Sequence, residues 1–165
     1  MFSAEELEAL VLGARWVQRQ PDPGLVDAAE NALGKIATAS PEDLRNRIND
    51  TGLRVASSAN GEAAKPALGL IRAAMRTEKS IFIHYRDEAG AVSERLICPV
   101  QLAYYDGKQI VAAWCCLRQG FRNFRIDRLV ETTATDQRFI RRRAVLAAEW
   151  RREWDIANPE WAGPR

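Results

Sequence analysis

The sequence predicts an α+β protein in which a helical segment precedes a small β-barrel or strongly bent sheet and a final helix. Apolar residues recur at helical spacing in the first part of the chain, and the period changes to strand alternation at Ser80. About five short strand-like runs with tight turns follow, too few for a sandwich of two sheets. We therefore expect a helical segment over 1–78, a five-stranded barrel over 79–134, and a helix with a tail over 135–165.

Cap signals and apolar stripes predict the helices of the first region. Ser3 and Glu6 have the spacing of a capping box, in which each side chain accepts a hydrogen bond from the other residue's backbone N–H. Ser40 precedes a proline and two carboxylates, which together favour a helix start. Pro66 suits a first helical turn and would disrupt a helix interior. We expect helices over about residues 4–19, 23–37, 40–48 and 66–77.

Alternation and turn residues predict the strands of the second region. Ile81, Ile83 and Tyr85 occupy every second position after Ser80, which is typical of a strand. Asp106-Gly107 is the strongest two-residue hairpin signal in the chain. A proline at 99 indicates an edge or a bulge. We expect strands over 80–86, 92–100, 102–105 (an extension or a separate strand), 109–117 and 121–132, and a helix over 136–154.

The composition is that of an ordinary globular chain and excludes several classes of protein. The 165 residues are 47% hydrophobic and 28% charged, and the net charge of +2 is too small to indicate a partner by itself. No apolar run approaches the roughly 20 residues of a transmembrane helix, and we expect no signal peptide. The thiols of Cys98, Cys115 and Cys116 fit reduced core cysteines. We therefore predict a cytoplasmic protein with no membrane contact.

Arginines gather in the segment Gln109–Leu129. Of the 24 basic residues in the chain 20 are arginine, which suits bidentate contacts with phosphate. If Gln119-Gly120 forms a two-residue turn, Trp114 pairs with Arg125 and side chains alternate between two faces. One predicted face is apolar and comprises Val111, Ala113, Cys115, Leu117, Phe124 and Ile126. The opposite face comprises Trp114, Cys116, Arg118, Asn123 and Arg125.

The polar face can be interpreted in two ways. Guanidinium groups beside an indole suit a nucleotide or a nucleic-acid single strand, because phosphates take arginines and bases stack on aromatic rings. Arg122 and Arg128 flank the apolar face and could project from the mouth of a barrel. Alternatively, Trp114 is a packed residue covered by arginine stems. The spacing leaves both interpretations open.

The sequence indicates no catalytic, cofactor or metal site. His84 is the single histidine, and no recognisable motif supplies the nucleophile and orienting carboxylate that a catalytic base requires. The cysteines and His84 lack zinc-ligand spacing. Phosphate-loop, dinucleotide-binding, metalloprotease and hydrolase motifs are absent from the sequence. We expect no enzymatic activity, no cofactor and no metal, and a structural or ligand-contacting role for His84.

Several short motifs carry a family resemblance. The run Ala112–Arg128 reads AAWCCLRQGFRNFRIDR, and the patterns Ile81-x-Ile83-x-Tyr85 and Arg95-x-x-x-Pro99 precede it. Together they resemble the WYL-domain family, specifically the YafY-type helix-turn-helix regulators of bacterial transcription. The resemblance implies an SH3- or Sm-like β-barrel and an effector-sensing role. It also implies that the basic residues hold single-stranded DNA or a nucleotide-like ligand.

Two features depart from the family pattern. The tripeptide that names the family falls at Gln109-Ile110-Val111, so its tryptophan and tyrosine are replaced here. Members of this group usually begin with a winged helix-turn-helix domain, and no such helix pair is visible before Ser80. We expect either a stand-alone sensor or a regulator whose DNA-binding domain lies before Met1 or acts in trans.

The combined prediction is a ligand-sensing module of a bacterial transcriptional regulator. We expect it to bind a single-stranded DNA or RNA oligonucleotide, or a nucleotide. The residues expected to contact the ligand are Arg118, Arg122, Arg125, Arg128, Trp114, His84 and Tyr85. The alternative is a protein-interaction or dimerisation module, which would bind a partner or a second copy of the chain without nucleic acid.

Overall fold

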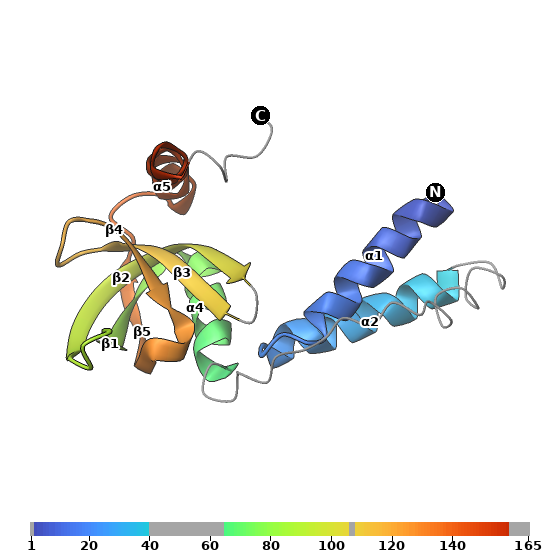
Figure 1. Cartoon of the computed structure of the whole chain (residues 1–165), viewed down its shortest axis with the longest axis horizontal. Coiled ribbons are helices and arrows are strands. Elements are labelled where there is room, and N and C mark those ends of the chain that lie inside the picture. The colour runs from blue at the N-terminus through green and yellow to red at the C-terminus, as the bar shows by residue number, and fades with distance from the viewer. Residues whose placement is uncertain (1, 40–64, 106–107, 159–165) are drawn as a thin grey trace. The chain divides into compact units, whose positions relative to one another are not determined.

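The structure is a computed structural model that describes residues 2–39, 65–105 and 108–158. These residues fall into two compact units, Met1–Lys65 and Pro66–Arg165. Each unit has its own contacts and is described by itself (Figure 1).

In the described part of the first unit, residues 2–39, two helices, α1 (Ala4–Val17) and α2 (Pro23–Ala39), pack against each other. The predicted capping box of α1 is confirmed, because the Ser3 N–H donates to Glu6 Oε2 (2.6 Å) and the Glu6 N–H donates to Ser3 Oγ (3.2 Å). The expected helix over 40–48 and the ambiguous stretch after it lie outside the described residues.

The second unit has an antiparallel five-stranded sheet in the order β4-β3-β2-β1-β5, with helices before and after it. The α+β class is therefore confirmed. The sheet is not closed, because β4 and β5 each have only one neighbouring strand, so the expected barrel is matched only loosely. Its elements are α4 (Lys65–Thr77), β1 (Lys79–Arg86), β2 (Val92–Tyr105), β3 (Lys108–Cys115), β4 (Gly120–Arg125), the 3₁₀ turn η1 (Ile126–Arg128), β5 (Leu129–Arg138) and α5 (Arg143–Ala157).

Three strand boundaries differ from the prediction. The runs 92–100 and 102–105 form one strand, β2, with a register shift between Pro99 and Gln101 that confirms the expected bulge. The predicted strand 121–132 is divided by η1. The strand β5 then continues to Arg138, where it pairs with Lys79 of β1, so the final helix begins at Arg143 and the predicted start at Asp136 was wrong. Cross-strand pairing overrides the local helical spacing here.

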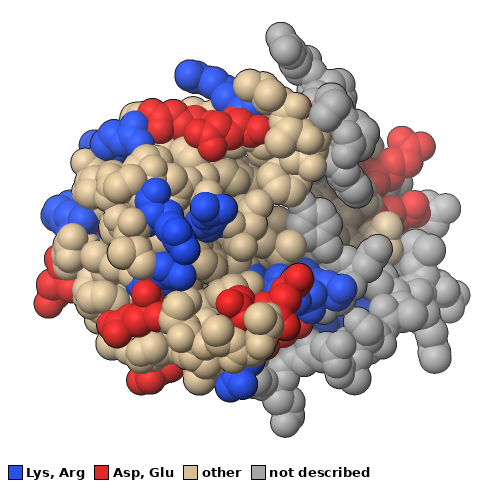
Figure 2. Space-filling model, turned by 60° about the vertical axis from the view of Figure 1, so that its left-hand side comes forward, with Lys and Arg blue, Asp and Glu red and all other residues tan. Residues whose placement is uncertain are grey.

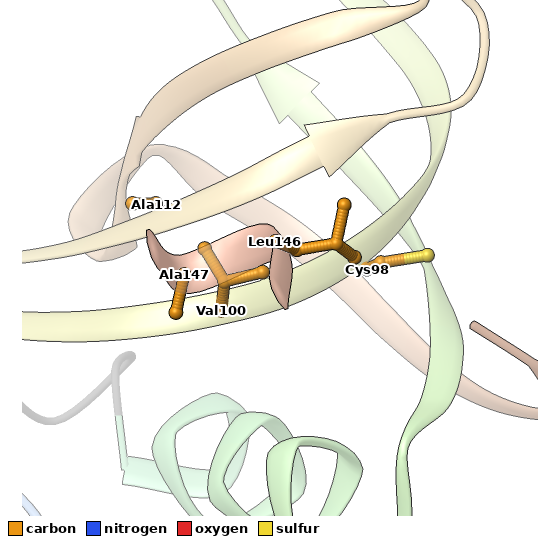
Figure 3. Packing of buried hydrophobic residues seen from close by; sticks show 5 residues of the cluster. All are labelled: Cys98, Val100, Ala112, Leu146 and Ala147. Atoms are coloured by element: carbon orange, nitrogen blue, oxygen red, sulfur yellow. The ribbon is translucent and has the colours of Figure 1, made fainter. Parts of the chain in front are cut away.

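Both sides of the sheet are covered by helices in part. Ile81, Ile83 and Val111 of the sheet are fully buried, as are Leu68 and Ile71 of α4. On the other side, α5 packs over β2 and β3 (Figures 1 and 3). The buried cluster at this contact consists of Cys98, Val100, Ala112, Leu146 and Ala147.

Candidate functional site

The β3–β4 hairpin carries most of the predicted ligand-binding residues, and its register differs from the prediction. Trp114 pairs with Phe121, and Ile110 pairs with Arg125, so the predicted pairing of Trp114 with Arg125 was wrong. The strands are joined by the four residues 116–119, not by a two-residue turn. Gln119 stabilises this turn: it adopts a positive φ of 50°, and its side-chain amide donates to the Cys116 carbonyl (2.6 Å).

The shift in pairing preserves the predicted faces of the strands, because it moves the partner by an even number of residues. Val111, Ala113, Cys115 and Phe124 are buried, as expected for the apolar face. Leu117 is the exception: it lies in the turn and is 65% exposed, so its predicted place in the core was wrong.

Trp114 lies on the side of the sheet that α5 covers. Its ring meets Phe121 edge to face at 5.2 Å between ring centroids, and Arg141 Cζ lies 5.2 Å from the indole centroid. Its Nε1 is buried and has no hydrogen-bond partner among the described residues. The indole is therefore packed beneath an arginine, as in the second interpretation of the sequence, although the arginine comes from the segment before α5.

Arg125, Arg128 and Tyr85 come together at the η1 end of β4. The Tyr85 hydroxyl accepts a long hydrogen bond from the Arg125 backbone N–H (3.4 Å), and its ring meets Phe124 edge to face at 5.1 Å. The pKa of Arg128 is raised by Glu88 and, to a smaller extent, by Tyr85. The hydrogen bond from the Arg125 N–H thus connects β1 to the end of β4, although Tyr85 and Arg125 are 40 residues apart in the sequence.

Both of these guanidinium groups already hold a carboxylate. Arg125 contacts Asp127 through Nε (3.0 Å) and one terminal nitrogen (2.6 Å), and Arg128 contacts Glu88 (3.0 Å). The hydrogen bond from Arg125 lowers the pKa of Asp127, while the hydrogen bond to Asp127 raises the pKa of Arg125. An anionic ligand at these arginines would compete with the two carboxylates.

Arg118 and Arg122 differ from that pair. Arg118 lies in the four-residue turn, Arg122 lies on β4, and both are exposed. Neither forms an ion pair with another residue in the described part of the chain. These two guanidinium groups can therefore meet an anion without first losing a partner.

His84 stands between two carboxylates on neighbouring strands. Its Nδ1 lies 3.2 Å from Glu131 of β5 and its Nε2 lies 3.9 Å from Glu94 of β2, because both glutamates pair with it in the sheet register. Tyr85 is the next residue on β1, so its side chain points to the opposite face. Across residues 2–39, 65–105 and 108–158, no group of three acidic, histidine or cysteine side chains is placed to hold a metal ion.

Sequence reasoning placed Arg125 beside Asp127 but missed Glu88, the acidic partner of Arg128. Asp127 stands two residues after Arg125, and that closeness was a local signal for the pair. Glu88 lies in the β1–β2 turn, forty residues from Arg128, and no local pattern connects them. The face of the molecule drawn in Figure 2 accordingly shows small groups of basic side chains interspersed with acidic and uncharged ones.

Comparison with known proteins assigns part of the chain to a family. Residues 66–134 match the model of the WYL domain, which confirms the resemblance noted from the motifs. Protein PafC from two strains of Mycobacterium tuberculosis is 30% identical over 112 residues, which cover 66% of this chain and 32% of PafC. The chain thus spans about a third of the length of these relatives. The YafY-type subgroup stays a prediction.

A solved structure also resembles the chain. It is the proteasome accessory factor B/C (PafBC) of Arthrobacter aurescens, with 25% sequence identity and a TM-score of 0.46. The match covers 84% of this chain and 21% of that one. Among the described helices, none is long and apolar enough to cross a membrane.

Proposed function

Because residues 66–134 match the model of the WYL domain, we propose that this chain is the ligand-sensing module of a transcriptional regulator. Its ligand is a single-stranded nucleic acid or a nucleotide-like anion held by the arginines of the β3–β4 hairpin and η1. The role involves no catalytic step and is exerted in the cytoplasm, with a DNA-binding domain acting in cis or in trans.

The observation that carries this proposal is the pair of unpartnered cations on the hairpin. Arg118 and Arg122 are exposed, and neither has an acidic partner among the described residues. An anionic ligand can pair with both guanidinium groups without displacing a carboxylate. Phosphate groups suit this role because arginine donates to phosphate oxygens in a bidentate manner.

Arg125 and Arg128 form the second part of the proposed site. Both guanidinium groups are bound to carboxylates, so a phosphate at this part of the site competes with Asp127 and Glu88. Arg125 uses Nε and one terminal nitrogen for Asp127, so its other terminal nitrogen is left to contact a phosphate.

Fluorescence anisotropy with a labelled single-stranded DNA oligonucleotide tests the proposal. The double variant Arg118→Ala/Arg122→Ala removes two charge-assisted contacts of about 1.5–3 kcal/mol each, so affinity falls by at least about a hundredfold. The matched control is Arg151→Ala/Arg152→Ala, which removes the same charge from exposed positions on α5. Equal losses in both double variants would show a general charge effect and would overturn the assignment of the site.

A further inference from the structure

A groove lies between the edge strand β4 and the helix α5. It has a volume of about 280 Å³ and lies on the side of the unit where Figure 1 draws α5. The helix lines it with residues at positions 150, 153, 154 and 157, whose spacing places them on one face. The strand lines it with Phe121, Arg122 and Asn123.

The backbone of β4 has a free edge along this groove. Of the strands that the structure describes, none pairs with β4 on the side away from β3. The Arg125 N–H donates to the Tyr85 hydroxyl, so it points away from β3. Because backbone groups in an antiparallel strand alternate in direction, the N–H and C=O groups of Phe121 and Asn123 point the same way. Among the described residues, no backbone hydrogen bond outside the sheet ladder involves either residue.

The helical wall supplies apolar surface and one charge. The Trp150 and Trp154 rings lie 5.5 Å apart at an interplanar angle of 30°. Both rings are partly exposed, and Phe121 continues the aromatic surface on the strand side. Glu153 is exposed on the same helical face and lies in the groove wall. An occupant would thus meet free main-chain groups and the Arg122 side chain on one side, and aromatic rings with a carboxylate on the other.

We propose that β4 accepts an extended peptide segment of a protein partner as an additional strand of the sheet. The main chain of the peptide pairs with Phe121 and Asn123, an aromatic or large apolar side chain packs against Trp150 and Trp154, and a basic side chain pairs with Glu153. Peptide addition at a sheet edge obtains its affinity from main-chain hydrogen bonds and its specificity from alternate side chains.

A peptide fits this groove better than a nucleic acid does. Evenly spaced backbone donors and acceptors match another peptide backbone, whereas nucleic-acid strands recognised by stacking need cations along the phosphate path. Glu153 would repel a phosphate. The inference goes beyond the proposed function because the groove depends on α5, which lies outside the matched residues 66–134.

The probe is a labelled pool of short peptides that fix tryptophan and arginine two positions apart, from which the tightest binder is measured by fluorescence anisotropy. Trp154→Ala and Glu153→Lys each weaken that binder by at least about fivefold, the range of contacts central to an interface. Asp155→Lys is the matched control, because Asp155 is exposed on α5 and does not line the groove. N-methylation of alternate peptide amides abolishes binding if the main chain pairs with β4.

The two proposals fail separately. Single-stranded DNA is titrated into the same proteins, and Glu153→Lys leaves its affinity unchanged or raises it, whereas the peptide affinity falls. A shortened protein that ends at Asn158 is assayed in parallel, because Asn158 lines the groove and residues 159–165 follow it directly in the sequence. The peptide proposal is overturned if neither protein binds the pool saturably. It is also overturned if the tightest binder tolerates both N-methylation and Glu153→Lys.

Discussion

The contact between Arg125 and Asp127 controls how much positive charge the hairpin offers to a ligand. Two hydrogen bonds of 3.0 and 2.6 Å align the groups, and the Asp127 side chain is still half exposed. An exposed ion pair of this kind stabilises a protein only weakly. Its larger effect is on binding, because a carboxylate beside the arginine repels an incoming phosphate.

The substitution Asp127→Asn should therefore strengthen binding of single-stranded DNA a few-fold. It removes the competing charge and keeps the shape of the side chain. Asp136→Asn is the control, because Asp136 pairs with Lys79 (2.8 Å), outside the arginine cluster. Anisotropy titrations of the three proteins measure the effect. Weaker binding by the Asp127 variant would show that the carboxylate orients Arg125 for the ligand and does not compete with it.

The lowered pKa of Asp127 predicts that stability depends on pH. The hydrogen bond from Arg125 lowers the pKa of Asp127, so this ion pair stabilises the folded state above the unfolded pKa of about 3.9. The stabilisation is lost as the pH falls through the lower folded pKa. The melting temperature of wild type should exceed that of Asp127→Asn near neutral pH, and the two should converge in acid. A difference that grows on acidification would contradict the assigned pairing.

Trp114 illustrates why the sequence left a packing role and a binding role open. A tryptophan with arginine neighbours is expected for either role. What distinguishes the two roles is α5, which covers Trp114 and comes from a distant part of the chain.

Packing predicts a specific outcome for Trp114→Ala. The free energy of unfolding should fall by about 3 kcal/mol. This is the lower end of the range for truncating a tryptophan in a core, because the ring is only partly buried. Trp114→Phe should keep the affinity for single-stranded DNA within about twofold if the ring does not touch the ligand. Chemical denaturation and anisotropy measure the two effects. A large loss of affinity without a loss of stability would place the indole in the binding site.

At the scale of elements, strand positions were predictable and their boundaries were not. Alternation identified the cores of β1 to β4, because one buried face imposes a period of two. The two-residue turn predicted at Gln119-Gly120 was wrong, because Gly120 belongs to β4 and Gln119 adopts the left-handed conformation at the end of a four-residue turn. The extension of β5 to Arg138 depends on pairing with β1, some 57 residues earlier in the chain. Local patterns carry no information on such contacts.

The helix α5 is also responsible for the inertness of a buried thiol. Burial raises the pKa of Cys98 to about 12, and Leu146 and Ala147 are part of the cluster that encloses it (Figure 3). Cys98 is therefore protonated at neutral pH and shielded from reagents, since the thiolate is the reactive form.

Leu146→Ala should open this contact. Truncating the fully buried leucine should destabilise the protein by about 3 kcal/mol, and alkylation of Cys98 at pH 8 should become faster. Val145→Ala is the neighbouring control, because Val145 is 46% exposed. Mass spectrometry of iodoacetamide-treated protein measures the rate at Cys98. Equal rates in both variants would show that α5 does not shield the thiol.

At the scale of the whole molecule, the second unit combines an arginine-bearing hairpin with a groove that extends beyond the matched family segment. The matched segment covers α4 and the sheet up to residue 134, including the four arginines. The tryptophans of the groove lie on α5, after that segment. This arrangement gives one unit two neighbouring surfaces, proposed for an anion and for a peptide, and Arg122 belongs to both.

The most direct test of the central claim is the salt dependence of binding to single-stranded DNA. Each phosphate contact contributes roughly −0.7 to the slope of log affinity against log salt concentration. The Arg118→Ala/Arg122→Ala variant should therefore show a slope that is shallower by about 1.4 than that of wild type, whereas Arg151→Ala/Arg152→Ala should keep the wild-type slope. An unchanged slope in the Arg118/Arg122 variant would contradict the claim that the hairpin arginines bind phosphate.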